Sequence, residues 1–330
     1  MGKKWKNNGQ WPKQPKIGLA LGGGSARGWA HIGVINELEQ IGVVPDIICG
    51  TSIGALVGGV YLAGQLDALR EWLLQLDRKE IIKYLDIRLL RGGGFVEGSR
   101  LMDFFHQQMG DLKIEDLPRP YTCVSTDLET GREIWFQKGL LLDAIRASIA
   151  VPGIFTPVHL GDRWLVDGGL VNPVPVSVCR ALGAELVIAV NLNQDSLNRH
   201  TGQLTHEYQH DDENEDSVES SLLQRISDEL KQRTDALVSQ FFEPKIPTPG
   251  LFDVLAGSIA IMQDRLTRSR MAGDPPDILL NPHVANIGLL EFDRAAEAIE
   301  AGKQCVTSML PAINCLVSNV CPATNHDETN

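Results

Sequence analysis

Gly50-Thr51-Ser52-Ile53-Gly54 stands between the apolar run Ile47-Ile48-Cys49 and the helix-like stretch Ala55–Ala63. This context predicts a strand, a tight turn and a helix, the setting in which a G-x-S-x-G serine is presented as a nucleophile. Glycine suits both flanks of Ser52, because a Cβ there would clash with the neighbouring backbone of a strained turn. The free N–H groups at the start of the following helix would favour negative charge. The stretch therefore predicts an α/β fold with Ser52 as a candidate nucleophile.

A second glycine cluster follows the strand-like segment Lys16–Leu21. It reads Gly22-Gly23-Gly24-Ser25-Ala26-Arg27-Gly28 and leads into a helical pattern over Trp29–Gln40. Two consecutive units of strand, glycine turn and helix place both turns at one edge of a parallel sheet. That edge is where open α/β sheets bind their ligands.

A nucleotide-binding loop is the first alternative for this cluster, and its spacing does not fit. A G-x-G-x-x-G motif that starts at Gly22 meets Arg27, and one that starts at Gly23 meets Ser25, where glycine is required. The Gly-Lys-Ser/Thr of a Walker A loop is absent, and the second strand ends at Ser52 and not at an acidic residue. The remaining interpretation is an oxyanion hole made of exposed backbone N–H groups.

An aspartate is the best candidate for the base that a nucleophilic serine needs. Asp167-Gly168-Gly169 follows the short apolar strand Trp164–Val166, so the carboxylate is presented at a strand end. No histidine after Ser52 occupies a comparable place late in the predicted sheet. The alternative is that Asp-Gly-Gly is an ordinary turn.

These motifs together resemble the patatin-like phospholipase family, in the bacterial branch related to the domain of neuropathy target esterase. They are Gly22-Gly23-Gly24-x-x-Arg27-Gly28, Gly50-x-Ser52-x-Gly54 and Asp167-Gly168-Gly169, in that order. The resemblance covers about residues 16–195 and departs from the family pattern at Ser25, where many members have glycine or alanine. It implies a three-layer α/β sandwich with a mainly parallel central sheet.

The resemblance also implies a Ser–Asp dyad, with Ser52 as the nucleophile and Asp167 as the only base. It assigns the oxyanion hole to the backbone N–H groups of Gly22, Gly23, Gly24 and Ser25. The residues that support the two turns are Arg27, Gly50, Gly54, Gly168 and Gly169. Arg27 would stabilise the glycine loop or bind an anionic head group, and the alternative is a surface arginine on the first helical turn.

The activity that follows is that of a carboxylic ester hydrolase acting on phospholipids, lysophospholipids or related lipids, without a cofactor or metal. A regulatory or adaptor protein that keeps the fold but has little turnover is the alternative, because fold does not dictate activity. A third possibility is a zinc protease, since His206-Glu207-Tyr208-Gln209-His210 matches H-E-x-x-H. We interpret this match as fortuitous, because acidic residues flank it where a buried zinc helix would be apolar.

Composition agrees with an enzyme-sized α/β protein. The 330 residues are 43% hydrophobic, enough for one large domain with additions, and the net charge of −12 argues against nucleic acid as a partner. No apolar run is long enough to span a membrane, and residues 1–16 do not resemble a signal peptide. The six cysteines have no C-x-x-C spacing, so we expect reduced thiols and a cytoplasmic location.

Charge and periodicity divide the chain into five predicted parts. The first part carries lysine and tryptophan without acids, and we expect it to make weak, transient contact with a membrane. The parts are a disordered basic tail (1–15), the patatin-like domain (16–195), an acidic linker (196–216), a helical C-terminal region that packs on the core (217–312) and a disordered tail (313–330). The sequence does not predict the oligomeric state.

Overall fold

A computed structural model of the chain describes residues 15–76, 80, 99–194 and 251–318. The predicted basic tail, the acidic linker with its H-E-x-x-H match and the first part of the predicted C-terminal region (217–250) therefore lie outside the described residues, except for residue 15.

The described strands form one eight-stranded sheet in the order β5-β6-β3-β2-β1-β7-β8, with β4 paired to β3. Strands β3, β2, β1, β7 and β8 are parallel, whereas β4 and β6 are antiparallel to β3, and β5 is antiparallel to β6. The strands are β1 (Ile17–Leu21), β2 (Ile47–Thr51), β3 (Tyr121–Asp127), β4 (Glu133–Phe136), β5 (Val158–Leu160), β6 (Arg163–Asp167), β7 (Leu186–Val190) and β8 (Ile278–Leu280).

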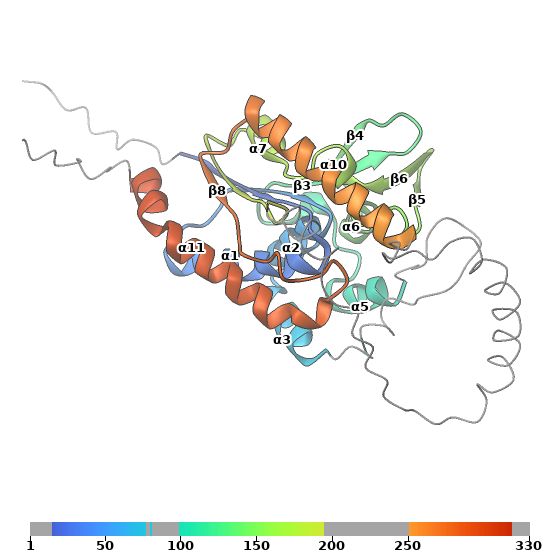
Figure 1. The fold of residues 1–330 in the computed structure, drawn as a ribbon, viewed down its shortest axis with the longest axis horizontal. Coiled ribbons are helices and arrows are strands. Elements are labelled where there is room, and N and C mark those ends of the chain that lie inside the picture. The colour runs from blue at the N-terminus through green and yellow to red at the C-terminus, as the bar shows by residue number, and fades with distance from the viewer. Residues whose placement is uncertain (1–14, 77–79, 81–98, 195–250, 319–330) are drawn as a thin grey trace, which may run out of the picture.

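Helices cover both faces of this sheet, as Figure 1 shows for α1 and α11 on one side and α7 and α10 on the other. The helices are α1 (Ala30–Gln40), α2 (Ile53–Leu62), α3 (Leu66–Gln75), α5 (Ser99–Met109), α6 (Leu141–Ser148), α7 (Val176–Ala181), α10 (Leu251–Gly273) and α11 (Ala295–Ser318). Short 3₁₀ helices are η1 (Ser25–Trp29), η2 (Ile114–Asp116), η3 (Gly168–Leu170) and η4 (Phe292–Arg294). The predicted α/β sandwich with a mainly parallel sheet is confirmed.

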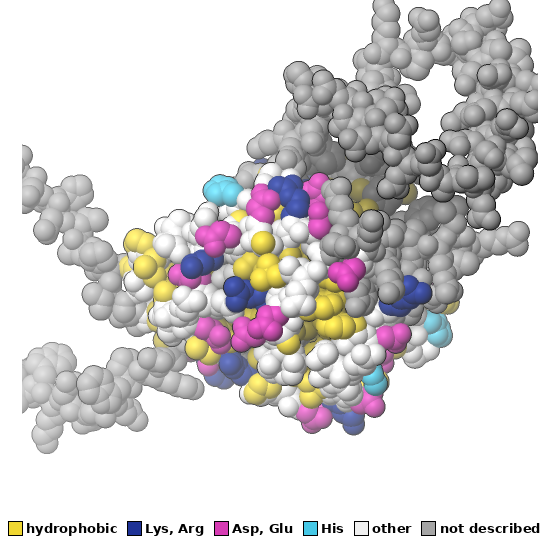
Figure 2. Space-filling model, turned by 90° about the horizontal axis from the view of Figure 1, so that it is seen from below, with side chains coloured by type: hydrophobic (Ala, Val, Ile, Leu, Met, Phe, Trp, Pro, Cys, Tyr) yellow, Lys and Arg dark blue, Asp and Glu magenta, His cyan; other side chains and the backbone are white. Residues whose placement is uncertain are grey.

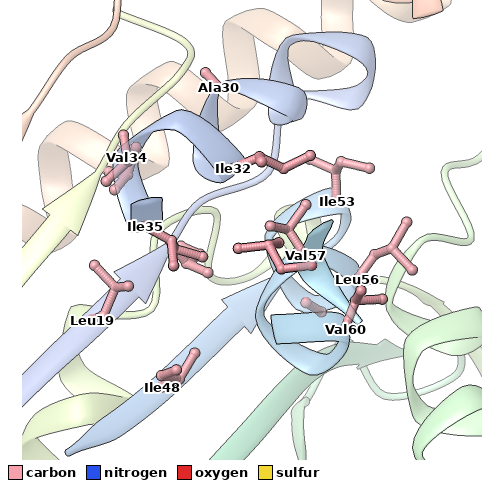
Figure 3. Close-up of a cluster of buried hydrophobic side chains, with 14 of the residues drawn as sticks. Leu19, Ala30, Ile32, Val34, Ile35, Ile48, Ile53, Leu56, Val57 and Val60 are labelled. Carbon is pink, nitrogen blue, oxygen red and sulfur yellow. The ribbon is translucent and has the colours of Figure 1, made fainter. Parts of the chain in front are cut away.

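The central strands are apolar throughout because both of their faces are buried. In β1, Leu19 belongs to the core cluster shared with α1 and α2, where Figure 3 shows it near Ile48 and Ile35. Its neighbour Ala20 belongs to the opposite cluster, together with Cys179 of α7. Side chains alternate between the two faces of a strand, so one short apolar run contributes to both cores.

The C-terminal helix α11 packs against α1 through two glycines. A Cβ on Gly33 of α1 would overlap the carbonyl oxygen of Ile299, and a Cβ on Gly302 of α11 would overlap the carbonyl oxygen of Ala30. The backbones of the two helices therefore approach more closely than any larger residue would allow. As a result, the C-terminal region is part of the core of the domain.

The boundary expected for the C-terminal tail is wrong by several residues. Helix α11 continues through Pro311 to Ser318, so residues 313–318 are helical. The reason is burial, because Ile313 has no exposed surface and belongs to the main core cluster. This apolar contact offsets the backbone hydrogen bond that proline removes from a helix.

The described surface carries both signs of charge. On the face that Figure 2 shows, acidic and basic side chains are interspersed with small hydrophobic patches. None of the helices in the described ranges combines the length and the apolar character needed to cross a membrane.

Among the described cysteines, Cys49, Cys123, Cys179 and Cys305 are free, whereas Cys315 is disulfide-bonded, so the expectation of reduced thiols fails at that position.

We predict that Gly302→Ala lowers the free energy of unfolding by about 1–3 kcal/mol, because the added methyl group forces α1 and α11 apart. Alanine normally stabilises a helix interior relative to glycine, so a loss of stability would come from the close packing of the two helices. The control is Gly273→Ala at the end of α10, where a Cβ meets nothing within 4 Å. Urea unfolding of both variants measures the difference, and an equal or stabilising effect of Gly302→Ala would contradict the packing argument.

Candidate active site

The pairing partners of β3 bring Ser52 and Asp167 together. Val124 pairs with Thr51 of β2 on one edge of β3 and with β4 on the other edge. The next residue, Ser125, pairs with Asp167 of β6 and again with β4. Since β4 occupies one edge, β2 and β6 must share the other edge, and their carboxyl ends meet there. Ser52, the residue after Thr51, therefore lies beside Asp167.

Ser52 occupies a strained turn at the start of α2. Its backbone has φ 56° and ψ −127°, a region that L-residues rarely adopt and that costs about 1–3 kcal/mol. The Ser52 N–H donates to Ser148 Oγ at 2.8 Å, and the Ser148 hydroxyl donates to the Val124 carbonyl at 2.5 Å. This buried relay ties the turn to α6 and β3, so the surrounding structure holds the strained conformation.

The glycines that flank Ser52 are required by close backbone contacts. A Cβ on Gly50 would overlap the backbone of Ala55, and a Cβ on Gly54 would overlap the carbonyl oxygen of Leu21. The turn is therefore pressed between its own helix and the end of β1. A larger residue at either position would displace Ser52.

Asp167 is a buried carboxylate at the end of β6, with 1% of its surface exposed. Burial raises its pKa from the ordinary 3.8 to about 6, while the Ser52 hydroxyl and the Gly169 N–H partly oppose that shift. The Gly169 N–H donates to Oδ1 at 2.7 Å. Oδ2 has no hydrogen bond of ordinary geometry among the described residues, although Ser52 is close enough to influence its pKa. Such a contact often tightens only when substrate binds.

The glycine loop lies directly over Ser52, but only part of it has free N–H groups. A Cβ on Gly23 would lie 3.4 Å from Ser52 Cβ. The N–H of Gly22 donates to Val190 O at 3.1 Å, and the N–H of Gly23 donates to Pro173 O at 3.0 Å. These two N–H groups are therefore not available to an oxyanion, contrary to the prediction from the sequence. Carbonyl groups of a neighbouring strand end and loop already accept their hydrogen bonds.

Gly24 and Ser25 remain as the candidate oxyanion donors. Within the described ranges, no acceptor is bonded to the N–H of either residue. Ser25 has φ 52°, an uncommon backbone conformation for a residue with a Cβ. Both residues line a pocket together with Ser52, which is the position that an oxyanion donor needs.

A loop before α11 holds this part of the glycine loop in place. The Ser25 hydroxyl donates to Leu289 O at 2.6 Å, and the Ala26 N–H donates to the same oxygen at 3.1 Å. Arg27 is 5% exposed and donates from Nε to Ile287 O at 2.8 Å. The surface-arginine interpretation is therefore wrong, and the contact supports the role of Arg27 in stabilising the glycine loop.

Sequence reasoning missed three polar residues behind the site. His31 Nε2–H donates to Gly22 O at 2.7 Å, and complete burial lowers the pKa of its imidazole to about 4, so the ring is neutral. Asn193 Nδ2 donates to Gly23 O at 3.3 Å, and Ser148 Oγ accepts the hydrogen bond from the Ser52 N–H. Of the three, only His31 has a usable signal in the sequence, since it closely follows the glycine cluster.

Ser52 lies between two pockets, and both also reach Ser25 and Val151. The larger one, here named the apolar pocket, has a volume of about 650 Å³ with its open mouth included. Its lining includes Trp29, Ile53, Leu56, Trp72, Leu101 and Phe292. The other, named the α10 pocket, measures about 540 Å³ on the same terms and includes Gly24, Ile154, Asn193, Leu255, Ala256 and Gln263.

We predict that Asp167→Asn stabilises the protein above pH 7. The pKa of Asp167 is higher in the folded chain, so its protonated form favours folding at low pH, and this contribution is lost as the pH rises through about 6. At pH 8 the buried charge costs about 3 kcal/mol, which the amide avoids. The advantage of the variant should shrink between pH 7 and pH 4 and vanish below that range.

Chemical unfolding of both proteins across this pH range measures the difference. The control is Asp162→Asn, which removes an exposed carboxylate from the turn before β6. If the free energies of unfolding of Asp167→Asn and the parent protein change with pH in the same way, the claim that the buried charge of Asp167 destabilises the fold is wrong.

Comparisons with known proteins identify the family of this chain. The family model for patatin-like phospholipases matches residues 19–180. An NTE family protein of Mycobacterium bovis is 35% identical over 90% of this chain and 92% of its own length. Lysophospholipase nte1 of Emericella nidulans is 26% identical over 87% of this chain, which spans only 17% of that protein. The crystal structure of VipD from Legionella pneumophila aligns with 91% of this chain and 67% of its own, at 14% identity and a TM-score of 0.43.

The family predicted from the three motifs is thereby confirmed. A relative of nearly the same length matches almost the whole chain, and the family model covers the segment from β1 into α7. The chain belongs to the NTE family of proteins and carries a patatin-like phospholipase domain.

Proposed function

We propose that this chain is a serine acyl-hydrolase that cleaves acyl esters of phospholipids, lysophospholipids or related lipids. Membership of a family of lipid hydrolases supports the general activity. The observation that carries the proposal is the meeting of Ser52 and the buried Asp167 at one edge of β3. An almost wholly apolar pocket beside Ser52 supports a lipid as the substrate.

In the acylation step, Asp167 accepts the proton of the Ser52 hydroxyl while Oγ attacks the acyl carbonyl carbon. The N–H groups of Gly24 and Ser25 stabilise the negative charge that forms on the carbonyl oxygen, and one such donor is typically worth about 3–4 kcal/mol. When the tetrahedral intermediate collapses, the alcohol leaves with the proton held by Asp167. The acyl group stays on Ser52 as an ester.

In the deacylation step, Asp167 accepts a proton from water, and the hydroxyl adds to the acyl carbon. Collapse of this second intermediate returns the proton to Ser52 and releases the fatty acid. A pKa of about 6 suits this role better than an ordinary carboxylate, because a base is most effective when its pKa lies near the working pH.

The alternative function is a regulatory or adaptor protein with this fold and little turnover. Such a protein would have no need to keep a carboxylate buried at a cost in stability. The strained conformation of Ser52 would also serve no purpose in it. Both features favour the enzyme.

Two further proposals concern contact with a membrane and the location of the protein. Residues 1–15 would make weak, salt-sensitive contact with anionic lipid through their lysines, each worth about 1 kcal/mol at most near such a surface. A cytoplasmic location would suit this contact. Removal of residues 2–14 should weaken co-sedimentation with anionic vesicles if the proposal is right.

We predict that Ser52→Ala and Asp167→Asn each lower kcat/KM on p-nitrophenyl butyrate by about 10⁴-fold or more, because the two residues act as one unit. A fluorophosphonate probe should label the parent protein once, at Ser52, and mass spectrometry identifies the modified peptide. Ser308→Ala, on the exposed surface of α11, is the control and should keep full labelling and activity.

Two outcomes would overturn the proposed function. Retained hydrolysis by Ser52→Ala would exclude this serine as the nucleophile. A parent protein that neither reacts with the probe nor hydrolyses any ester would favour the adaptor.

We predict that kcat/KM falls tenfold per pH unit below about pH 6 and is level above it. Only the ionised form of Asp167 accepts the serine proton, and its pKa is raised to about 6. p-Nitrophenyl butyrate suits the measurement because the ester has no group that titrates in this range. A profile that stays level down to pH 5 would show that the base has an ordinary carboxyl pKa.

A further inference from the structure

The two pockets beside Ser52 differ in chemistry. Apart from the shared residues Ser25 and Ser52, every residue that lines the apolar pocket is aliphatic or aromatic. The α10 pocket adds the side-chain amides of Asn193 and Gln263 to its aliphatic lining. A hydrocarbon chain gains from a lining made mostly of aliphatic and aromatic carbon, whereas the hydroxyl and ester oxygens of a glycerol need hydrogen-bonding groups.

The α10 pocket also lies on the side of Asp167. A Cβ on Gly169 would lie 2.9 Å from Asp167 Oδ1 and would overlap Nε2 of Gln263. The amide of Gln263, which lines the α10 pocket, is therefore packed over the turn that holds the Asp167 carboxylate. In the proposed reaction the departing alcohol must take its proton from Asp167, so the alcohol half of the ester has to lie on this side.

Polarity and proton transfer thus lead independently to one orientation. We propose that the acyl chain of the substrate occupies the apolar pocket and that its alcohol half occupies the α10 pocket, with the scissile ester over Ser52. This inference rests on the proposed function and deepens it by assigning a ligand to each pocket. It also implies that water for deacylation enters through the α10 pocket. Departure of the alcohol opens this pocket while the acyl chain still fills the apolar pocket.

The orientation makes residues of the two pockets control different features of the substrate. Leu101 of α5 and Phe292 of η4 line the apolar pocket, so their size should set the preferred acyl length. Ala256 of α10 lines the opposite pocket, so its size should set the tolerance for bulky alcohols. Each methylene that enters the apolar pocket should raise kcat/KM about three- to fourfold until the pocket is full.

The experiment uses two substrate series with the full-length chain. p-Nitrophenyl esters of acids with 4 to 16 carbons vary the acyl half with a constant leaving group. Laurate esters of methanol, glycerol and glycerophosphocholine vary the alcohol half with a constant acyl chain. Leu101→Trp should lower the ratio of rates on the longest and shortest acyl esters at least tenfold and leave the ratios among laurate esters unchanged. Ala256→Trp should leave the acyl-length profile unchanged. It should lower the rate on the laurate esters of the bulky alcohols at least tenfold relative to methyl laurate.

Phe292→Ala provides a second test of the apolar pocket, because it enlarges the pocket and should move the preferred acyl length upward. Circular dichroism and thermal melting check that each variant is folded, and Phe292→Ala decides the matter if Leu101→Trp does not fold. If Ala256→Trp alters the acyl-length profile, or if both apolar-pocket variants leave it unchanged, the assignment is wrong. A parent protein without any esterase activity or probe labelling would refute the proposed function itself, a result distinct from active variants with unaltered preferences.

Discussion

The pairing of β3 is the constraint on which the rest of the site depends. One edge of this strand pairs with β2 up to Val124 and with β6 from Ser125 onward. Two strands of opposite direction therefore end at the same place, and the residues at those ends are Ser52 and Asp167. A shift of one residue in either pairing would turn side chains to the other face of the sheet and separate Ser52 from Asp167. The Ser148 hydroxyl accepts a hydrogen bond from the Ser52 N–H and donates one to Val124 O, so it links Ser52 to this register.

This arrangement destabilises the site, although the core around it is stable. Ser52 has an unfavourable backbone conformation, and Asp167 is buried where its charge is disfavoured. The apolar contacts of β1 and β2 with α1, α2 and α7 on both faces of the sheet offset these costs. Such opposition between stability and activity is common in enzymes, because a reactive carboxylate must be kept away from the water that would lower its pKa.

The C-terminal region belongs to the same functional unit, although the matched family segment ends at residue 180. Its loop accepts hydrogen bonds from Ser25, Ala26 and Arg27, and Phe292 contributes to the apolar pocket while it contacts Trp29 edge to face. The close crossing of α1 and α11 fixes this loop relative to β1. The glycine loop is therefore shaped by residues more than 250 positions away in the chain.

The sequence by itself determined the features that depend on neighbouring residues. The apolar strands, the glycines around Ser52 and the Asp-Gly-Gly turn have local physical causes, and they sufficed to predict the fold class and the two candidate catalytic residues. Only the tertiary structure decided which N–H groups of the glycine loop are free, because the acceptors of Gly22 and Gly23 lie on Val190 and Pro173. It also decided the raised pKa of Asp167 and the extent of α11, since burial is a sum of contacts from distant segments that no local pattern contains.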